Sequence, residues 1–411
     1  MALAQVRIKS FKSIVDQTID LGQLNVFIGS NGAGKSNLLE AIAMLSCAVD
    51  GRIDYSKLSD RGSRLSAPEI FKSSFKNLPR KKNFSIDASF GNLKYHANIH
   101  ANNEVEFKFD AERLDRIAEE EKIGGRSNAG ITISGLKKEL FSKLSSQQSI
   151  VSTLESLGRF DETEQKELEA IQRYAIYSLS TPILRGVSED SSKKEPLGLY
   201  GGSLANALND VIRDARKETT PLRPDHDIQR FFALFDWFES IGTDNNISTK
   251  LQSSHLHTGK IVVKYVDRFM KTNFNSLYAY DVSEGALYIL FILVLLLHSK
   301  APPLFALDNV DSALNPSMVM KVMAHITELL KNMPDKQVLM TTHNPTTLDA
   351  IDLFNPLHRL FVVQRNQQGH TEFKRIEPPS GFTRESWVEK HGGMRLSEIW
   401  LSGLLGGLAE I

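Results

Sequence analysis

The sequence predicts an α/β fold, and three observations support this prediction. A short β-type run over residues 24–28 enters a glycine-rich loop and is followed by a helical pattern. In the C-terminal third, two apolar β-type runs each end in a polar residue, Asp308 and His343. Between these ends of the chain, charged helical patterns predominate. Both ends are therefore expected to form one α/β body, with a mainly helical segment inserted between them.

The glycine-rich loop, GSNGAGKS, satisfies the spacing G-x-x-x-x-G-K-[ST] from Gly29 onward. Glycines at these places let backbone N–H groups turn around phosphate oxygens, and the following helix adds its positive N-terminal end. Lys35 is expected to reach the β- and γ-phosphates, and the Ser36 hydroxyl to bind Mg²⁺. The predicted cofactor-binding residues of the loop are Asn31, Gly32, Ala33, Gly34, Lys35 and Ser36. The loop therefore predicts a nucleotide-binding site.

Composition and charge narrow the class of protein. Lys plus Arg equals Asp plus Glu at 49 each, so the net charge is zero and contact with DNA or RNA is expected only from a local patch. The single cysteine, Cys47, excludes an internal disulfide and suits a reducing compartment. No signal-peptide pattern opens the sequence, and the longest apolar run, residues 286–297, is too short to span a bilayer. The run predicts a buried helix in a cytoplasmic protein that does not contact a membrane.

The remaining patterns place the elements in order. A β-rich opening over residues 6–28 precedes the helix after Ser36, and a three-strand meander follows over residues 84–111. Its predicted turns are Gly91-Asn92 and Asn102-Asn103. Helical patterns are predicted for 111–176, 206–216 and 228–241, and β-type patterns for 262–270, 304–308, 337–343 and the two runs of the tail. The predicted domains are a body of residues 1–110 and 260–411 and an insertion of residues 111–259.

The second half of the site is predicted in the C-terminal third. Asp308 ends the apolar run LFALD, a form that places a carboxylate near Mg²⁺ beside a phosphate loop. The stretch DVSEGALYILFILVLLL begins the buried helix at Ser283 and Gly285, and His343 lies in VLMTTHNP.

Taken in order, VRIKSFKSI, GSNGAGKSNLLEAI, VSEG, LFALDNVDSALNP and TTHNP resemble the ABC-type ATPases of the SMC, RecF and OLD group. The chain is similar to compact stand-alone AAA ATPases of bacterial anti-phage systems, of the PtuA type found in Septu. The resemblance covers residues 1–50 and 275–365. It implies a P-loop ABC-type ATPase head with an N-terminal β-rich lobe that binds ATP and dimerises on it.

The resemblance also implies that each site is shared between two copies of the chain. Lys35, Ser36 and Asp308 of one copy would hold ATP and Mg²⁺. Ser283 and Gly285 of the other copy would meet the γ-phosphate, so that only ATP closes the dimer. His343 would sense the γ-phosphate, and a buried or helix-capping histidine is the alternative. A homodimer, or a higher even oligomer, is therefore expected.

One position departs from the family pattern. The family has Glu directly after the strand's Asp, where it positions or activates the attacking water, and this chain has Asn309. An amide can orient water but cannot accept its proton as a base. Asp311, two residues further on, is a partial substitute. The sequence therefore predicts slow hydrolysis and a protein that works mainly as an ATP-held switch.

The resemblance implies an ATPase subunit of an antiviral defence complex that controls a separate nuclease or toxin effector. This separation is expected because the acids after His343 are scattered and no HNH-type histidine cluster appears. The rival interpretation is a RecF-like DNA repair ATPase that binds ends or gaps through the basic run 72–82, for which a solvated loop is the simpler reading. The LLGGL tail fits either a partner-docking end or a frayed terminus.

Overall fold

The structure is a computed structural model that describes residues 2–136, 144–215, 224–245, 251, 260–309 and 311–405. Contacts between residues divide the chain into two compact units. Unit 1 comprises Met1–Ile176, Pro302–Asp311 and Pro316–Ile411. Unit 2 comprises Tyr177–Ala301 and Ser312–Asn315. The α/β class is confirmed, whereas the contacts place the first division after residue 176 and not at residue 110.

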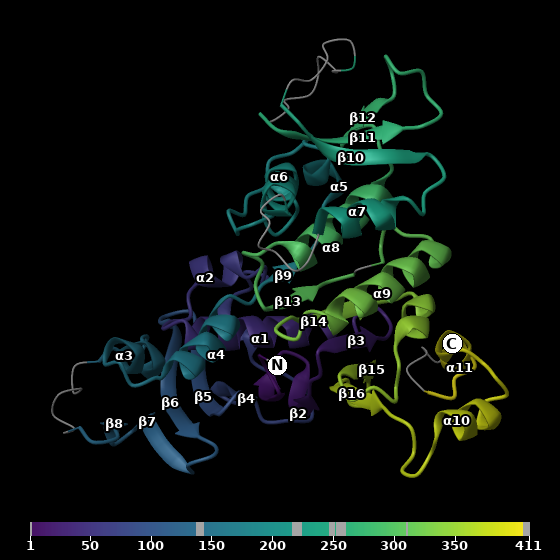
Figure 1. Ribbon diagram of the computed structural model, residues 1–411. Helices are drawn as coiled ribbons and strands as arrows, with labels where there is room; N and C mark the ends of the chain where they lie inside the picture. The colour runs from purple at the N-terminus through teal and green to yellow at the C-terminus, as the bar shows by residue number, and fades with distance from the viewer. Residues whose placement is uncertain are drawn as a thin grey trace. The chain divides into compact units, whose positions relative to one another are not determined.

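Unit 1 is built on two sheets (Figure 1). The seven-stranded antiparallel sheet has the order β2-β1-β4-β5-β6-β7-β8. Its strands are β1 (Gln5–Phe11), β2 (Ile14–Asp20), β4 (Asn83–Phe90), β5 (Leu93–Asn102), β6 (Glu106–Arg116), β7 (Glu121–Ser127) and β8 (Gly130–Ile133). The six-stranded sheet has the order β16-β15-β3-β14-β13-β9. Its strands are β3 (Leu24–Ile28), β9 (Ile176–Tyr177), β13 (Leu304–Leu307), β14 (Gln337–Thr342), β15 (His358–Arg365) and β16 (Thr371–Ile376).

One helix, α1 (Lys35–Val49), lies in the core that joins these sheets, and nearly all of its side chains are buried. The same hydrophobic core contains Phe27 of one sheet and Val6 of the other. The other helices of unit 1 are α2 (Tyr55–Asp60), η1 (Pro68–Phe71), α3 (Ile150–Ser156), α4 (Glu162–Gln172), α9 (Pro316–Lys331), η3 (Pro345–Ala350), α10 (Arg384–Lys390) and α11 (Leu396–Leu401). Because α1 is fixed on both sides, the loop that precedes it has a firm base.

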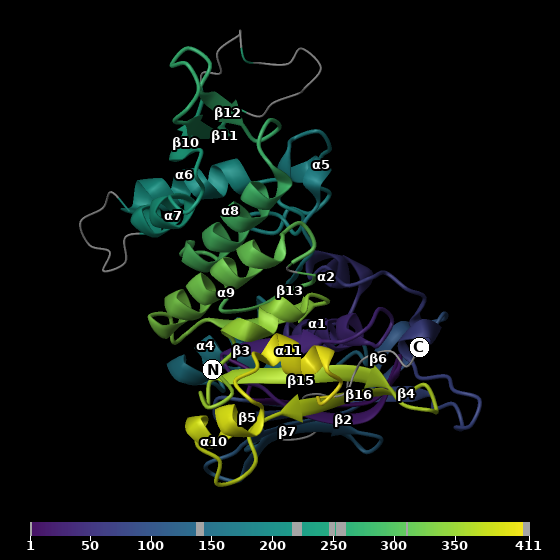
Figure 2. The ribbon, with the colours of Figure 1, turned by 90° about the vertical axis from the view of Figure 1, so that its right-hand side faces the viewer.

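The parallel part of the six-stranded sheet positions the site. β3 pairs in parallel with both β14 and β15, and β13 pairs in parallel with β14. The carboxyl ends of these strands therefore meet at one edge, where ligands of open α/β sheets bind. The antiparallel strand β16 lies beside β2 of the other sheet (Figure 2), where the Thr371 N–H donates to the Ser13 carbonyl at 2.8 Å.

The helical prediction for residues 111–176 is confirmed for α3 and α4 and is wrong for residues 111–133, which complete β6 and form β7 and β8. A buried charge explains the error. Glu112 points into the core, where Tyr95 Oη and Ser149 Oγ donate to its carboxylate at 2.8 and 2.7 Å. Arg126 Nε lies 3.2 Å from the same carboxylate. A glutamate at an inward position hides the alternation of a strand, and the charged residues around it favour a helix.

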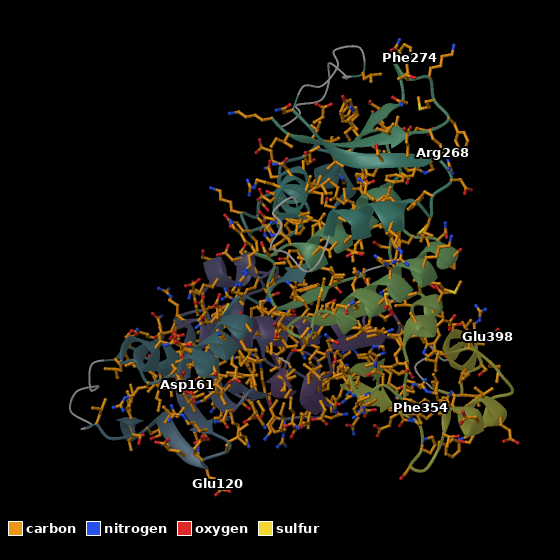
Figure 3. The ribbon with its side chains drawn as sticks, viewed as in Figure 1. Glu120, Asp161, Arg268, Phe274, Phe354 and Glu398 are labelled. Atoms are coloured by element: carbon orange, nitrogen blue, oxygen red, sulfur yellow. The ribbon has the colours of Figure 1, made fainter. Side chains whose placement is uncertain are left out.

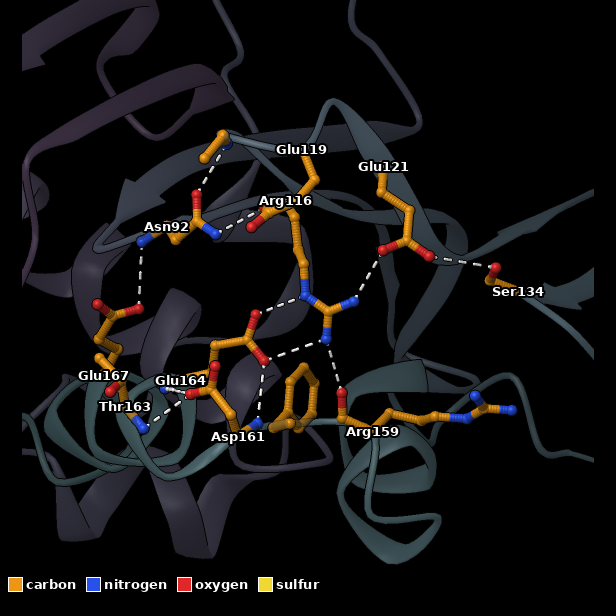
Figure 4. A network of polar contacts seen from close by, with 12 residues as sticks. Asn92, Arg116, Glu119, Glu121, Ser134, Arg159, Asp161, Thr163, Glu164 and Glu167 are labelled. Atoms are coloured by element: carbon orange, nitrogen blue, oxygen red, sulfur yellow. Dashed lines mark hydrogen bonds and ion pairs between the residues drawn. The ribbon is translucent and has the colours of Figure 1, made fainter.

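A polar network ties the end of β6 to α4 (Figure 4). Arg116 donates to the Glu164 carboxylate at 2.6 and 3.1 Å and to the Arg159 carbonyl at 2.8 Å. A third contact, at 2.9 Å, joins Arg116 to Glu121 of β7. Glu164 also closes the capping box of α4, because it accepts from the Asp161 N–H at 3.1 Å. Residues 111–176 are therefore part of the body and not of the insertion.

Unit 2 combines helices with a small sheet of order β10-β11-β12. Its elements are α5 (Thr181–Leu184), α6 (Leu204–Ala215), α7 (Pro224–Phe232), β10 (Phe238–Asp244), β11 (Val262–Asp267), β12 (Ser276–Tyr278) and α8 (Glu284–Leu297). The predicted buried helix is confirmed as α8, and the predicted helix at 206–216 lies largely in α6. The helix predicted over 228–241 ends at Phe232, and β10 follows, where Phe238 packs 5.4 Å from the Phe232 ring. Within the described ranges, no helix is long and apolar enough to cross a membrane.

Candidate functional site

The candidate site is a hollow of 260 Å³ at the carboxyl ends of β3, β13 and β14. All of its lining residues belong to unit 1. They are Asn31, Gly32, Gly34, Lys35, Ser36, Asn37, Arg64, Asn309, His343 and Arg365. The sequence predicts seven of these ten positions, so the two predicted halves of the site do meet in the fold.

The glycine-rich loop is pressed against β15 and β16, and two of its glycines are required there. A Cβ on Gly29 would lie 2.0 Å from the Val363 carbonyl oxygen. At Gly34, which has φ +112°, a Cβ would lie 2.1 Å from Thr371 Oγ1. The Thr371 hydroxyl donates to the Ala33 carbonyl at 2.7 Å and so holds the loop from behind. The loop leads directly into α1, whose first N–H groups have no partner within the helix and attract anions.

The Lys35 ammonium lies over its own loop. Its Nζ donates to the carbonyls of Gly29 and Ser30 at 2.7 and 3.1 Å and lies 3.4 Å from His343 Nδ1. Burial lowers the pKa of Lys35 to about 8, while the carboxylates of Asp308 and Asp311 act in the opposite direction. The pKa of His343 is lowered by burial and by the nearby Lys35, so its imidazole is neutral at pH 7. A positive, partly buried group therefore occupies the floor of the hollow.

The side chains of Ser36, Asp308 and Thr341 form a chain of hydrogen bonds at the end of β13, and Ser36 is next to Lys35 in the sequence. Ser36 Oγ donates to Asp308 Oδ2 at 3.1 Å, and the Thr341 hydroxyl donates to Asp308 Oδ1. Adjacent oxygen ligands of octahedral Mg²⁺ at 2.0–2.1 Å lie about 3 Å apart, so Ser36 and Asp308 fit such an ion. In the described part of the chain, no three His, Cys, Asp or Glu side chains gather as a metal site. An ion bound by Ser36 and Asp308 would therefore take its other ligands from phosphate and water, as Mg²⁺ usually does.

The turn after β13 has an uncommon backbone. Asn309 has φ +56°, a left-handed conformation that asparagine adopts more readily than most residues. The backbone N–H of Asn309 donates to Thr341 Oγ1 at 2.9 Å, which fixes the backbone of the turn, and Asn309 lines the hollow. The Asp311 carboxylate accepts from the Asn344 N–H at 2.9 Å, so it holds the turn that follows β14. Asp311 therefore positions the backbone after β14, in addition to the catalytic role predicted for it.

Sequence reasoning missed Asn37, Arg64 and Arg365. Asn37 follows the loop motif directly, but Arg64 and Arg365 have no local signal because they come from distant parts of the chain. Arg64 donates to the Glu40 carboxylate and, at 3.1 Å, to Asn37 Oδ1. Arg365 Nε donates to the Gly32 carbonyl at 2.9 Å. These three residues also line a second, adjoining hollow of 510 Å³, so the site extends beyond the phosphate loop.

Part of the predicted basic run is neutralised. Lys72 is buried and lies 3.0 Å from the Glu69 carboxylate, and Arg80 also pairs with Glu69, at 2.5 Å. Lys76, Lys81 and Lys82 are exposed. The run therefore presents fewer free charges than its sequence indicates.

The remaining two predicted residues belong to unit 2. Ser283 is the N-cap of α8, and its hydroxyl accepts from the Ala286 N–H at 3.4 Å. Gly285 lies in the first turn of α8, where a Cβ would approach the Ala313 carbonyl oxygen to 3.2 Å. The tight fit at Gly285 keeps the start of α8 close to residues 312–315 of the same unit.

The lowered pKa of Lys35 predicts a pH dependence of nucleotide affinity. Phosphate binds the protonated ammonium and raises its pKa, so affinity is full below pH 8 and falls by up to about tenfold per pH unit above it. Titration calorimetry in two buffers of different ionisation enthalpy should show uptake of nearly one proton at pH 9. Lys35→Arg, whose side chain stays protonated, is the control and should flatten the profile. An equally steep profile in Lys35→Arg contradicts the assignment.

Comparison with known proteins identifies a family whose model matches most of the chain. Residues 24–349 match the family described as "AAA domain, putative AbiEii toxin, Type IV TA system". No curated protein matches the chain. Solved structures similar to it include an SmcHead bound to the C-winged helix domain of ScpA, with 13% identity, TM-score 0.49 and coverage of 92% of this chain and 98% of that chain. Another is the SMC head domain from Thermotoga maritima, with 15% identity, TM-score 0.42 and coverage of 92% and 100%.

Proposed function

Because this chain belongs to the family of AAA domains that residues 24–349 match, we propose that it is an ATPase subunit that binds ATP with Mg²⁺ and hydrolyses it slowly. Lys35, Ser36 and Asp308 bind the nucleotide and its ion, and Asn309, Asp311 and His343 act around the γ-phosphate. Mg²⁺, when bound, neutralises charge on the phosphate oxygens. The observation that supports this proposal is the meeting of Lys35, Ser36 and Asn309 in one hollow, with Asp308 3.1 Å from the Ser36 hydroxyl.

Each residue around the hollow has a separate task. Lys35 supplies a positive charge that burial prevents water from screening fully. The neutral His343 accepts or donates a hydrogen bond without adding charge. The Asn309 amide orients a water molecule but leaves it protonated, which accounts for slow hydrolysis. The adjoining hollow beside Arg64 and Arg365 has room for the remainder of a nucleotide.

We further propose that each site is completed by a second copy of the chain. Ser283 and Gly285 begin α8, a helix of 14 residues whose N-terminal end attracts anions. In this arrangement they meet the γ-phosphate held by the partner copy, so that ATP closes the dimer and ADP opens it. The resulting switch controls a separate nuclease or toxin effector in antiviral defence. The description of the matched family links such AAA domains to a type IV TA system, and this link to toxin systems motivates the proposed role.

Mixing two inactive variants tests the shared site. Lys35→Ala removes the phosphate contact, and Ser283→Arg blocks the start of α8. In a 1:1 mixture, half of the dimers combine both variants, and each of these has one intact site, so about a quarter of the wild-type sites should return. Single-turnover phosphate release should recover to that level, and nucleotide-dependent dimerisation should return for the mixed dimers, which are half of the total. A mixture as inactive as its components contradicts a site shared between copies.

The rival function, DNA repair, has a weaker basis because Glu69 pairs with two cations of the basic run. Filter binding to duplex and gapped DNA over a range of salt concentrations separates the two functions. A steep salt dependence that appears only with ATP and is lost in Lys81→Glu/Lys82→Glu supports repair.

A further inference from the structure

The loop between β11 and β12 presents large apolar side chains to solvent. Phe269 is 74% exposed, Phe274 is 51% exposed and Met270 is 42% exposed. Figure 3 shows Phe274 and Arg268 in this loop, away from the strands of the sheet. Single exposed apolar residues are common, but three within six residues of one loop form a patch that usually marks an interaction site.

Hydrogen bonds hold this loop in one conformation. The Asp267 N–H donates to the Asn275 carbonyl at 2.9 Å and so closes the base of the loop. The Phe269 N–H donates to Asp267 Oδ1 at 2.8 Å, and the Phe274 N–H donates to the Lys271 carbonyl at 2.7 Å. Because the loop is already ordered, a partner that binds it does not have to offset the entropy of ordering it.

The segment before β10 extends the patch. The Arg268 N–H donates to the Trp237 carbonyl at 3.0 Å, and Phe238 pairs with Asp267. Residues 237–238 therefore lie beside the loop, and Leu234 precedes them by three residues in the chain. Leu234 is exposed and Trp237 is half-buried, with its ring 6.0 Å from that of Tyr265 in β11. We define the β11-loop patch as the five apolar residues Leu234, Trp237, Phe269, Met270 and Phe274. Aromatic residues and Met are enriched in the centres of protein interfaces.

The charges around the patch are of both signs and are divided between its two segments. Arg268 and Lys271 belong to the loop, and the Arg268 guanidinium lies 5.1 Å from the centre of the Phe269 ring. Asp236 and Glu239, both exposed, belong to the segment before β10. A membrane surface or a nucleic acid, each anionic, would be attracted by the first segment and repelled by the second. A partner surface that itself has one basic and one acidic segment would be attracted by both segments of the patch.

We propose that the β11-loop patch binds the same patch of a second copy of the chain about a two-fold axis. In such a contact, Arg268 and Lys271 of each copy face Asp236 and Glu239 of the other, and the apolar residues meet at the centre. The inference rests on the proposed function in that it supplies a second contact for an even oligomer. It needs no nucleotide, whereas the contact through Ser283 does.

The oligomeric state without nucleotide tests the apolar centre. Sedimentation velocity over a wide concentration range should show a dimer for the wild type. Phe269→Ser and Phe274→Ser should each raise the dissociation constant by roughly 30-fold, as expected when an aromatic residue is lost from the centre of an interface. Val187→Ser is the matched control, since Val187 is 59% exposed in the same unit but lies outside the patch. A wild type that stays monomeric at every concentration overturns the proposal. A monomeric wild type that binds anionic vesicles overturns it as well, because the patch would then bind a membrane surface.

Charge reversal tests the two-fold arrangement. Arg268→Glu/Lys271→Glu and Asp236→Lys/Glu239→Lys should each weaken the dimer, because like charges then face each other at both ends. Mixing the two variants should restore a heterodimer of wild-type strength, since both ends are then complementary. Two variants that remain monomeric when mixed contradict self-association through this patch.

The same measurements separate this contact from the nucleotide-dependent one. Lys35→Ala should leave the dimer without nucleotide unchanged and abolish further assembly on ATP. Phe269→Ser should weaken the dimer that forms without nucleotide and leave the assembly driven by ATP intact. If the wild type forms the patch dimer but does not assemble further on ATP, the proposed function is contradicted and the patch is not. Loss of the patch dimer, with intact ATP-driven assembly, contradicts the patch alone.

Discussion

Asn309→Asp should raise the rate of ATP hydrolysis by roughly 100-fold, at the low end of the effect of a general base. Residue 309 lines the hollow, and the hydrogen bond from its backbone N–H to Thr341 holds the backbone there. The carboxylate accepts the proton that the amide cannot. Phosphate release at saturating ATP and Mg²⁺ measures the change, and Lys35→Ala in the same background should remove it.

The backbone conformation at position 309 distinguishes the two possible carboxylate substitutions, Asn309→Asp and Asn309→Glu. Asn309 has φ +56°, and aspartate tolerates this conformation almost as well as asparagine, whereas glutamate does not. Asn309→Glu should therefore also raise turnover but lower the melting temperature, and Asn309→Asp should leave the melting temperature nearly unchanged. Brisk turnover in the wild type that Asn309→Ala does not alter would contradict the role of Asn309 in slowing hydrolysis.

Those parts of the site that are set by local geometry were predictable from the sequence. The loop motif fixes Lys35 and Ser36 relative to the end of β3, and an apolar run that ends in a carboxylate fixes Asp308. The pairing of β13 with β14 and of β14 with β3 then brings these ends together, as a parallel sheet requires. Arg64 and Arg365 were not predictable because only the tertiary fold brings them to the hollow.

The fold prediction failed where a buried charge replaces an apolar residue. Strand β6 places Phe107, Phe109 and Leu114 inward, but its remaining inward position is Glu112. Glu112 is tolerated because Tyr95, Ser149 and Arg126 surround its carboxylate, and none of these lies near it in sequence. Helix propensity therefore outweighed a strand pattern that only the folded neighbours make visible. The same error moved residues 111–176 into the insertion.

Gly34→Ala should lower nucleotide affinity by at least roughly 100-fold, because two separate costs add at this position. A Cβ would lie 2.1 Å from Thr371 Oγ1, where β16 supports the loop from behind. The φ of +112° adds backbone strain of about 1–2 kcal/mol for any residue with a Cβ. Since the loop must shift to relieve both, the N–H groups at the start of α1 lose their alignment. Binding of a fluorescent ATP analogue and the melting temperature measure the two consequences.

Gly32→Ala is the matched control. Gly32 has φ +76°, so alanine there suffers similar backbone strain, but no atom lies within 4 Å of its Cβ. We expect a loss of affinity of less than about tenfold, since strain is the only cost within the protein itself. The difference between the two variants therefore isolates the contact with Thr371.

Removing the obstructing side chain completes the test. Thr371→Ala alone should weaken binding moderately, because the loop loses the hydrogen bond from Thr371 to the Ala33 carbonyl. In Gly34→Ala/Thr371→Ala the two shortest contacts are gone and only Ser13 Oγ, at 3.0 Å, stays close to the new Cβ. Affinity should therefore exceed that of Gly34→Ala, with a coupling energy of about 1–3 kcal/mol. Additive losses would mean that β16 does not shape the loop and that strain at Gly34 accounts for the whole effect. A positive coupling would show that the phosphate loop depends on a strand more than 330 residues away, which no motif in the sequence encodes.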